Sequence, residues 1–285
     1  MKILEKERIA ENLTKFIIDS PLIAQKALPG QFIVLMVREN GERIPLTIVE
    51  ADKKKKTITI IFQEVGYTTK ILGKLEAGES LYSLTGPLGK PTPIKNYGKV
   101  IVLGGGVGIA ELLPIAKALK QKGNHISTIL GVKTKGLLIL EQELRAVSDE
   151  FYITTDDGSY GKKGFTVDIL KDLLTKYEIL NTKYELVYCV GPIPMMRAVS
   201  ELTRPFKIKT IVCLNSIMID GTGMCGCCRV TVAGAVKFTC VDGPDFDGHL
   251  VDFNELTIRQ KRFLEHEKES ICKLDEQLLI EKEVL

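Results

Sequence analysis

Hydrophobic and polar positions follow a strand-like pattern over the first third of the chain. From Ile9 to about Leu84, β-rich runs of six residues are separated by turn residues, and glycine, proline and asparagine between such runs are typical of strand connections. The clearest runs are 32–37, 44–49 and 57–62, separated by Pro29-Gly30, Asn40-Gly41 and Asp52-Lys53. This pattern predicts a small antiparallel barrel or sandwich over residues 1–97.

Near Lys99 the pattern changes to alternating strands and helices. A buried strand at 100–103 is followed by a glycine turn and an amphipathic helix at 109–122, whose apolar positions repeat with the helical period. Further strands are expected at 126–130, 151–155 and 186–190, and helices near 140–147 and 165–174. Such alternation predicts an α/β domain with a parallel sheet over residues 98–210.

The remaining residues, 211–285, are expected to form a small C-terminal unit. An apolar run at 211–218 leads into a cysteine-rich loop, and two short strand-like runs follow at 229–232 and 235–240. From Asn254 onward the sequence is charged and helical in pattern. A helix of this kind packs on its own domain or against a partner subunit, and the first reading is the simpler one.

Composition narrows the class of protein. The chain has 285 residues, 45% of them apolar, which is enough for two or three cores. Lys and Arg number 39 against 36 Asp and Glu, so neither nucleic acid nor an acidic membrane surface is expected as a partner. The lysine run 53–56 is read as a hairpin tip. Without a signal-like start or a long apolar run, a cytoplasmic location is expected.

Cysteines are concentrated in one stretch, Asp220-Gly-Thr-Gly-Met-Cys225-Gly-Cys227-Cys228, with Cys240 further on. Five of the seven cysteines lie between Cys213 and Cys240, and such density in a long chain of this kind points to metal binding or electron exchange. The plant-type two-iron, two-sulfur frame is C-x4-C-x2-C followed by a distant cysteine. Cys225, Cys228 and Cys240 fit that frame, and Asp220 occupies the first ligand position.

Other readings of these cysteines remain open. A zinc site accepts three cysteines and a carboxylate, although structural zinc usually takes two C-x2-C pairs and only one is present. Buried or incidental thiols are the third possibility. Cys227 competes with Asp220 for the last ligand position, whereas Cys213 lies in an apolar run where a small buried residue is the default.

The carboxyl ends of the parallel strands supply the nucleotide-site candidates. Ligands bind at such strand ends in open α/β sheets. The glycine turn is not the dinucleotide fingerprint, because Ile109 stands where the last glycine would be, and a tight strand-to-helix turn without a ligand explains it equally well. The candidates are Gly104, Gly105, Gly106, Val107, Gly108, Asp157, Gly158, Gly191, Pro192 and Met195.

Two motifs in the barrel region carry an anion-binding pattern. An arginine and the start of a helix present donors in the geometry that phosphate oxygens accept, so the two can share a pyrophosphate. Either motif alone is weak evidence. The residues are Arg43, Pro45, Leu46 and Thr47 in the first motif, and Gly66, Thr68 and Thr69 in the second.

With these pieces in this order, the chain resembles the ferredoxin-NADP reductase superfamily over nearly its whole length. Within it, the chain is similar to electron-transfer subunits of the dihydroorotate dehydrogenase B type. It is also similar to the small subunit of electron-bifurcating NADH-dependent reduced ferredoxin:NADP oxidoreductase, also described as a sulfide dehydrogenase subunit. The resemblance implies FAD at the barrel motifs, NAD(H) at the strand ends, and a 2Fe-2S cluster on Asp220, Cys225, Cys228 and Cys240.

Two departures from the family pattern bear on this assignment. Glu111 follows Gly-Gly-Gly-Val-Gly-Ile-Ala, where the family often has proline, and its carboxylate would repel a phosphate that came close. The dihydroorotate type has cysteine where Asp220 stands, whereas an aspartate ligand is what the bifurcating small subunits have. Asp220 therefore favours the second relative.

The resemblance implies an electron chain from NAD(H) through flavin and cluster to a larger flavin and iron-sulfur subunit, in a heterodimer or higher complex. Ferredoxin and NADP would then be reached through that partner. Alternatives are an electron-transfer subunit of dihydroorotate dehydrogenase B, of a hydrogenase or of a sulfide dehydrogenase, or a redox-sensing regulatory module. NAD(H) is expected over NADP(H), because the lysines Lys133 and Lys135 form no arginine fork and Asp156 and Asp157 add negative charge.

Overall fold

The computed structural model describes residues 1–179 and 183–283. Its N-terminal part consists of two antiparallel sheets, in the strand orders β1-β2-β6-β5 and β4-β3-β7. Two short helices accompany them. The elements are β1 (Ile3–Ala10), β2 (Leu13–Asp19), α1 (Pro21–Lys26), β3 (Phe32–Met36), β4 (Ile44–Thr47), β5 (Glu50–Asp52), β6 (Thr57–Gln63), α2 (Tyr67–Leu72) and β7 (Ser83–Leu88).

The core of this part lies between the two sheets. Phe16 and Phe62 meet edge to face with ring centroids 5.2 Å apart, an arrangement that aromatic pairs prefer. Ile33 and Leu35 of β3 pack against them from the other sheet, with no exposed surface. The predicted antiparallel barrel is confirmed as a barrel-like pair of sheets.

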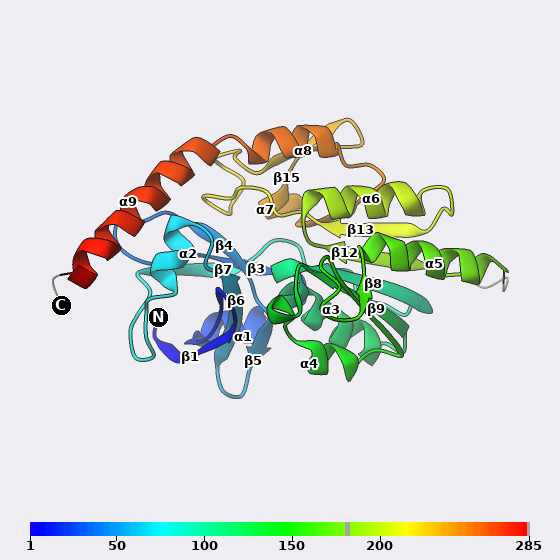
Figure 1. Cartoon of the computed structure of the whole chain (residues 1–285), viewed down its shortest axis with the longest axis horizontal. Helices are drawn as coiled ribbons and strands as arrows, with labels where there is room; N and C mark the ends of the chain where they lie inside the picture. The colour runs from blue at the N-terminus through cyan, green and yellow to red at the C-terminus, as the bar shows by residue number, and fades with distance from the viewer. Residues whose placement is uncertain (180–182, 284–285) are drawn as a thin grey trace.

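The second part of the chain, the α/β domain, is built on a seven-stranded sheet in the order β11-β10-β9-β8-β12-β13-β16. All neighbouring pairs are parallel except the last, β13 with β16. Helices cover both faces (Figure 1), as the parallel-sheet prediction requires. The elements are β8 (Lys99–Gly105), α3 (Ile109–Gln121), β9 (His125–Val132), α4 (Glu141–Arg145), β10 (Glu150–Thr155), β11 (Lys162–Lys163), α5 (Thr166–Ile179), β12 (Leu186–Val190), α6 (Ile193–Thr203), β13 (Lys209–Cys213) and β16 (Asp245–Asp247).

The C-terminal part is built around a hairpin and two helices: β14 (Arg229–Val232), β15 (Ala235–Phe238), α8 (Phe253–Gln260) and α9 (Leu264–Glu283). The run 235–240 was expected to be a strand to its end, but Cys240 lies in the short helix α7 (Thr239–Asp242). That turn brings Cys240 back toward Cys228. The expected helical tail is confirmed as far as residue 283, and residues 284 and 285 lie outside the described residues.

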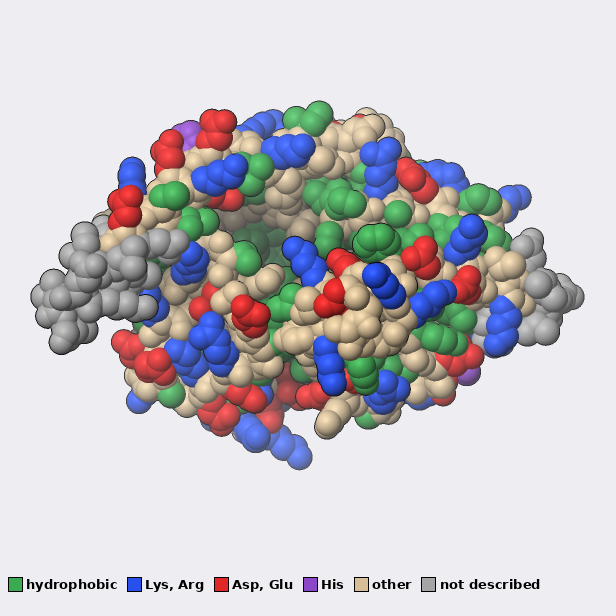
Figure 2. Space-filling model, in the orientation of Figure 1, with side chains coloured by type: hydrophobic (Ala, Val, Ile, Leu, Met, Phe, Trp, Pro, Cys, Tyr) green, Lys and Arg blue, Asp and Glu red, His purple; other side chains and the backbone are tan. Residues whose placement is uncertain are grey.

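The three parts pack side by side. α9 extends away from the C-terminal hairpin and lies beside α2 of the barrel (Figure 1). On the face shown in Figure 2 the surface is hollowed between the barrel and the α/β domain, and hydrophobic side chains lie in the hollow. Among the described helices, none has the length and apolar character that crossing a bilayer requires.

Candidate functional site

A cavity of about 1260 Å³ lies at the junction of the barrel, the α/β domain and the C-terminal part. Each of the three parts contributes a segment to its wall, so residues far apart in sequence meet there. The segment from the C-terminal part is Leu214 to Ser216 and Met218. Predicted site residues at the wall are Pro45, Leu46, Thr47, Thr69, Gly105, Gly106, Val107, Gly108, Gly191, Pro192 and Met195.

The glycine turn lies at the end of β8 because only glycine fits the space there. Gly106 has φ +57°, in the left-handed region. A Cβ on Gly108 would lie 3.0 Å from the carbonyl oxygen of Val190, and one on Gly105 would lie 2.7 Å from Met195 Sδ. The turn is therefore pressed against the neighbouring strand end, and its backbone forms part of the cavity wall.

The barrel offers a free donor for an anion just before the segment that lines the cavity. Arg43 precedes β4, and its Nε is buried without a hydrogen-bond partner, one of three such side-chain atoms among the described residues. An unpaired buried guanidinium nitrogen is costly unless a ligand satisfies it, so this atom fits an anionic group. The Thr69 hydroxyl instead accepts from Gly66 N at 2.9 Å and so caps α2. Thr68 donates to Glu42.

Several predicted residues do not reach the cavity wall: Arg43, Gly66, Thr68, Gly104, Asp157 and Gly158. Asp157 lies in the exposed turn after β10, where its carboxylate accepts from Ser159 N at 2.9 Å. The Ser159 hydroxyl and amide lower the pKa of Asp157. The neighbouring Asp156 and Lys133 do line the cavity. The residue after β10 that reaches the cavity is therefore Asp156, one position before the predicted Asp157.

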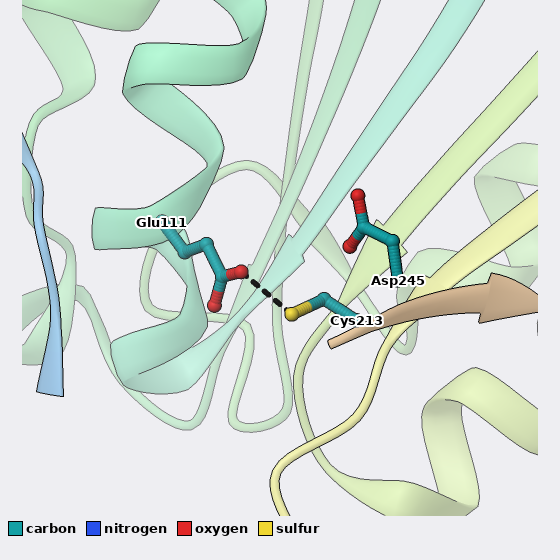
Figure 3. A group of neighbouring side chains, drawn as sticks. All are labelled: Glu111, Cys213 and Asp245. Carbon is teal, nitrogen blue, oxygen red and sulfur yellow. Dashed lines mark hydrogen bonds between the residues drawn. The ribbon is translucent and has the colours of Figure 1, made fainter. Parts of the chain in front are cut away.

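Glu111, Cys213 and Asp245 form a group of facing acids (Figure 3), of which Glu111 and Cys213 line the cavity. Their ligand atoms lie within 4.8 Å of one another. Cys213 Sγ donates to Glu111 Oε1 at 2.6 Å, and Thr47 Oγ1 donates to Glu111 Oε2 at 3.2 Å. Tyr188 and Thr92 donate to the two oxygens of Asp245 at 2.9 and 2.6 Å.

Desolvation dominates the titration of this group. Glu111 is only half-buried as a residue because it lines the cavity, but its carboxyl lies deep among protein atoms. That burial raises the pKa of Glu111 to about 7. Burial also raises the pKa of Asp245 to about 6 and that of the Cys213 thiol well above its ordinary value. Removing water penalises the charged form of each acid, and neighbouring negative charge adds to the effect.

The cysteine-rich loop is organised by Asp220. Its carboxylate accepts from Thr222 N at 3.0 Å, Met224 N at 2.9 Å and Cys225 N at 2.8 Å. Burial would raise the pKa of Asp220, but these backbone hydrogen bonds outweigh it and lower the pKa to about 2. Asp220 is thus an ionised carboxylate at the centre of the loop.

The loop cysteines divide into an exposed and a buried pair. Cys228 and Cys240 are buried with their sulfurs 3.3 Å apart, whereas the Cys225 and Cys227 side chains contact each other nearer the surface. Burial and the Cys228 contact raise the pKa of Cys240 to about 12. A two-iron cluster takes two ligands on each iron, so Cys228 with Cys240 fits one pair and Asp220 with Cys225 fits the other.

Some residues of the site were not anticipated from the sequence. Cys213 was expected to be a plain buried residue, and Glu111 was considered only as a source of repulsion toward phosphate. In the structure the two are hydrogen-bonded to each other. Arg259 of α8 donates to the carbonyl oxygen of Cys227 at 3.0 Å and so ties the loop to the helical tail. For the Glu111 and Cys213 pair, the sequence offered one signal of a functional role, which was a carboxylate in the first helical turn after the glycines.

Two protein-family models match separate parts of the chain. The iron-sulfur cluster binding domain of dihydroorotate dehydrogenase B matches residues 215–252, and the oxidoreductase NAD-binding domain matches residues 102–201. The chain is 45% identical to a dihydroorotate dehydrogenase B electron-transfer subunit homologue of Thermotoga maritima, covering 94% of this chain and 93% of the homologue. It is 32% identical to the corresponding subunit of Geobacillus thermodenitrificans, covering 86% and 95%.

Solved structures show the same fold. A chain of the NADH-dependent reduced ferredoxin-NADP oxidoreductase, studied for flavin-based electron bifurcation, superposes with a TM-score of 0.88 at 42% identity, covering 96% of this chain and 97% of that one. Phthalate dioxygenase reductase shares the fold with a TM-score of 0.56 at 18% identity, covering 92% of this chain and 80% of that one. The chain belongs to the family of dihydroorotate dehydrogenase B electron-transfer subunits and their homologues, within the ferredoxin-NADP reductase superfamily.

Proposed function

We propose that this chain is the electron-transfer subunit of a flavin and iron-sulfur oxidoreductase, carrying electrons between NAD(H), FAD and a 2Fe-2S cluster and on to a larger partner subunit. When bound, the flavin accepts a hydride and releases electrons one at a time, which the cluster then carries. The chain's own residues hold these groups in fixed relation and shape the cavity between them.

The observation that carries the proposal is the position of the buried cysteine pair. Phe32 lines the cavity and also belongs to the small core that contains Cys228 and Cys240. Val34 and Met218 complete that core. The same small core therefore borders the cavity and contains the sulfurs, and such proximity is what transfer of electrons between redox groups requires.

Residue roles are assigned from the cavity wall and from Arg43, which lies two residues before the wall residue Pro45. Arg43 supplies an unsatisfied donor for the pyrophosphate of FAD, and we assign Thr47, which donates to Glu111, to the flavin ring. The glycine turn and Met195 receive the nicotinamide nucleotide. Asp220, Cys225, Cys228 and Cys240 hold the cluster. The tip of the cluster loop is open, with Met224 89% exposed, so electrons leave the subunit there.

For the partner, we propose the larger subunit of an NADH-dependent reduced ferredoxin:NADP oxidoreductase. The 42% identity and the TM-score of 0.88 to a chain of that enzyme support it, as does Asp220 at the first ligand position. A dihydroorotate dehydrogenase B partner is the second candidate, supported by a 45% identical electron-transfer subunit homologue and by subunits with 30 to 32% identity over 86% of this chain. Affinity purification from the native cell, followed by identification of the co-purifying flavoprotein, separates the two.

The three structural units are part of the proposal. Residue 210 lies inside β13, a strand of the parallel sheet. We therefore propose units at 1–97 for FAD, 98–213 for NAD(H) and 214–285 for the cluster, with the last boundary moved from 210 to follow Cys213.

The test is anaerobic titration of the purified, cofactor-loaded protein with NADH. Flavin absorption should bleach, and the electron paramagnetic resonance signal of a reduced 2Fe-2S cluster should follow. Cys228→Ala should lose that signal while flavin still bleaches, and Cys272→Ala, at an exposed cysteine of α9, should behave as the native protein. Flavin bleaching without any cluster reduction in the native protein would contradict the proposal.

A further inference from the structure

Glu111 bridges two parts of the protein at the cavity wall. It lies in the first turn of α3, and its two carboxyl oxygens point in different directions. Oε2 accepts from Thr47 of the barrel at 3.2 Å, and Oε1 accepts from Cys213 of β13 at 2.6 Å. Figure 3 shows the carboxyl directed toward Cys213, with Asp245 on the adjacent strand. Nothing in the proposed electron chain described above uses this carboxyl.

The proposed reaction leaves a proton that needs an acceptor. Hydride is one proton and two electrons, so NADH that delivers its electrons singly to one-electron carriers yields NAD⁺, two electrons and one proton. The electrons leave through the cluster to the partner's one-electron acceptors. The proton remains at the flavin, inside a cavity walled mainly by apolar side chains, and the same proton must be supplied when electrons flow the other way.

We propose that Glu111 takes up this proton when NADH is oxidised and returns it in the reverse direction, with the Thr47 hydroxyl as its connection to the flavin. This inference rests on the proposed function. In the charged state Glu111 accepts from Thr47 and Cys213, as observed. Once protonated on Oε2, it donates to Thr47 Oγ1 instead, because a hydroxyl both donates and accepts. Glu111 is thus a proton-holding residue that acts through Thr47.

The surroundings of Glu111 favour reversible protonation. The ionisable groups that face it are Cys213 on β13, Asp245 on β16 and Tyr188 on β12, and each is neutral or negative. Thr47 on β4 is uncharged. Burial raises the pKa of Glu111 to about 7, near the pH at which proton exchange in either direction is most efficient. A carboxyl held at an ordinary acid pKa would release its proton too readily to serve both directions.

A purely structural role predicts different behaviour. If Glu111 only clasps α3 to β4 and β13, its removal should loosen the cavity and slow every step to a similar degree. A proton-holding role should slow only the step in which the proton leaves. Glu111→Gln keeps the shape and both hydrogen-bond partners but cannot titrate, so it separates the two readings. Glu201→Gln, at an exposed glutamate of α6, is the matched control.

The experiment uses stopped-flow spectroscopy of the cofactor-loaded protein, following flavin reduction by NADH and then electron arrival at the cluster. In the native protein the second step should depend on pH with an inflection near 7 and should slow in deuterium oxide. Glu111→Gln should slow this step by about 100-fold and remove the inflection, while hydride transfer changes by less than about threefold. Thr47→Val should act in the same direction, and Glu111→Asp should restore part of the rate.

A second readout needs no turnover. Infrared difference spectra of the cofactor-free protein between pH 5 and 9 should contain protonated-carboxyl bands from both Glu111 and Asp245, of which the Glu111 band is lost in Glu111→Gln and kept in Glu201→Gln. Loss of that band with unchanged stopped-flow profiles would overturn the inference. Equal slowing of the hydride-transfer and electron-transfer steps in Glu111→Gln would also overturn it. Glu111 would then only hold α3 to β4 and β13. Failure of the proposed function itself would show separately, as no NADH bleaching in the native protein.

Discussion

Replacing Arg43 by alanine should release FAD selectively. Arg43 Nε is buried and makes no hydrogen bond within the protein, so the substitution removes a donor to the cofactor without breaking an internal contact. A charge-assisted hydrogen bond contributes about 1.5 to 3 kcal/mol, which corresponds to a roughly 10- to 150-fold weaker Kd for FAD. The stability of the cofactor-free protein should change by less than about 1 kcal/mol.

The assay is fluorescence of released flavin during dilution of the loaded protein, with cluster absorption recorded in parallel. The cluster should remain, because its proposed ligands lie between Asp220 and Cys240, within the matched iron-sulfur domain, rather than in the barrel. Arg8→Ala is the control, since Arg8 lies on β1 of the same barrel with its side chain 60% exposed and a long 3.8 Å contact to Glu64. If Arg43→Ala held FAD as tightly as the Arg8→Ala control, the assignment of Arg43 to the pyrophosphate would be refuted.

Three further results are expected. Asp220→Cys should keep the 2Fe-2S cluster but change its spectrum and reduction potential, whereas Cys227→Ala should leave both nearly unchanged; cluster loss in Cys227→Ala with an unaltered Asp220→Cys would exchange the two assignments. Flavin reduction should be more efficient with NADH than with NADPH, and equal kcat/KM values would disprove this preference. Cofactor-free protein should lose stability as pH rises from about 4 to about 7, because folded Glu111 and Asp245 keep protons that the unfolded chain releases; the Glu111 share of this loss is at most about 3 kcal/mol. Chemical denaturation at several pH values checks this, and Glu111→Gln should flatten the slope.

The sequence predicted the fold well because its signals are local. β-rich runs between turn residues marked β3, β4 and β6 of the barrel, and buried apolar runs marked the parallel strands, so the broad order of the parts could be read. The two domain types and the cluster loop followed from that order. β16 was missed because it has three residues, too few to show a period, and its pairing with β13 depends on residues more than thirty positions apart.

The candidate site was predicted in part. Strand-end glycines were found because a parallel sheet brings its carboxyl ends to one edge. The Glu111 and Cys213 contact could not be predicted, since it joins residues 102 positions apart and each looked ordinary in its own segment. Asp157 was chosen over Asp156 because sequence alone does not show which of two adjacent turn residues faces a cavity. The unpaired Nε of Arg43 also required the packed structure.

The pairing of β13 with β16 has a consequence for how the cluster moves. Cys213 and Asp245 are direct partners across that antiparallel pair. The cluster-binding segment between them therefore leaves the sheet and returns to it at the same pair of residues. A segment held at both ends in this way cannot move as a domain on a flexible linker does. The separation between cavity and cluster is therefore set once, on folding, and electrons cross it without waiting for a hinge. Motion of the cluster-binding segment relative to the parallel sheet is therefore not the step that gates electron flow.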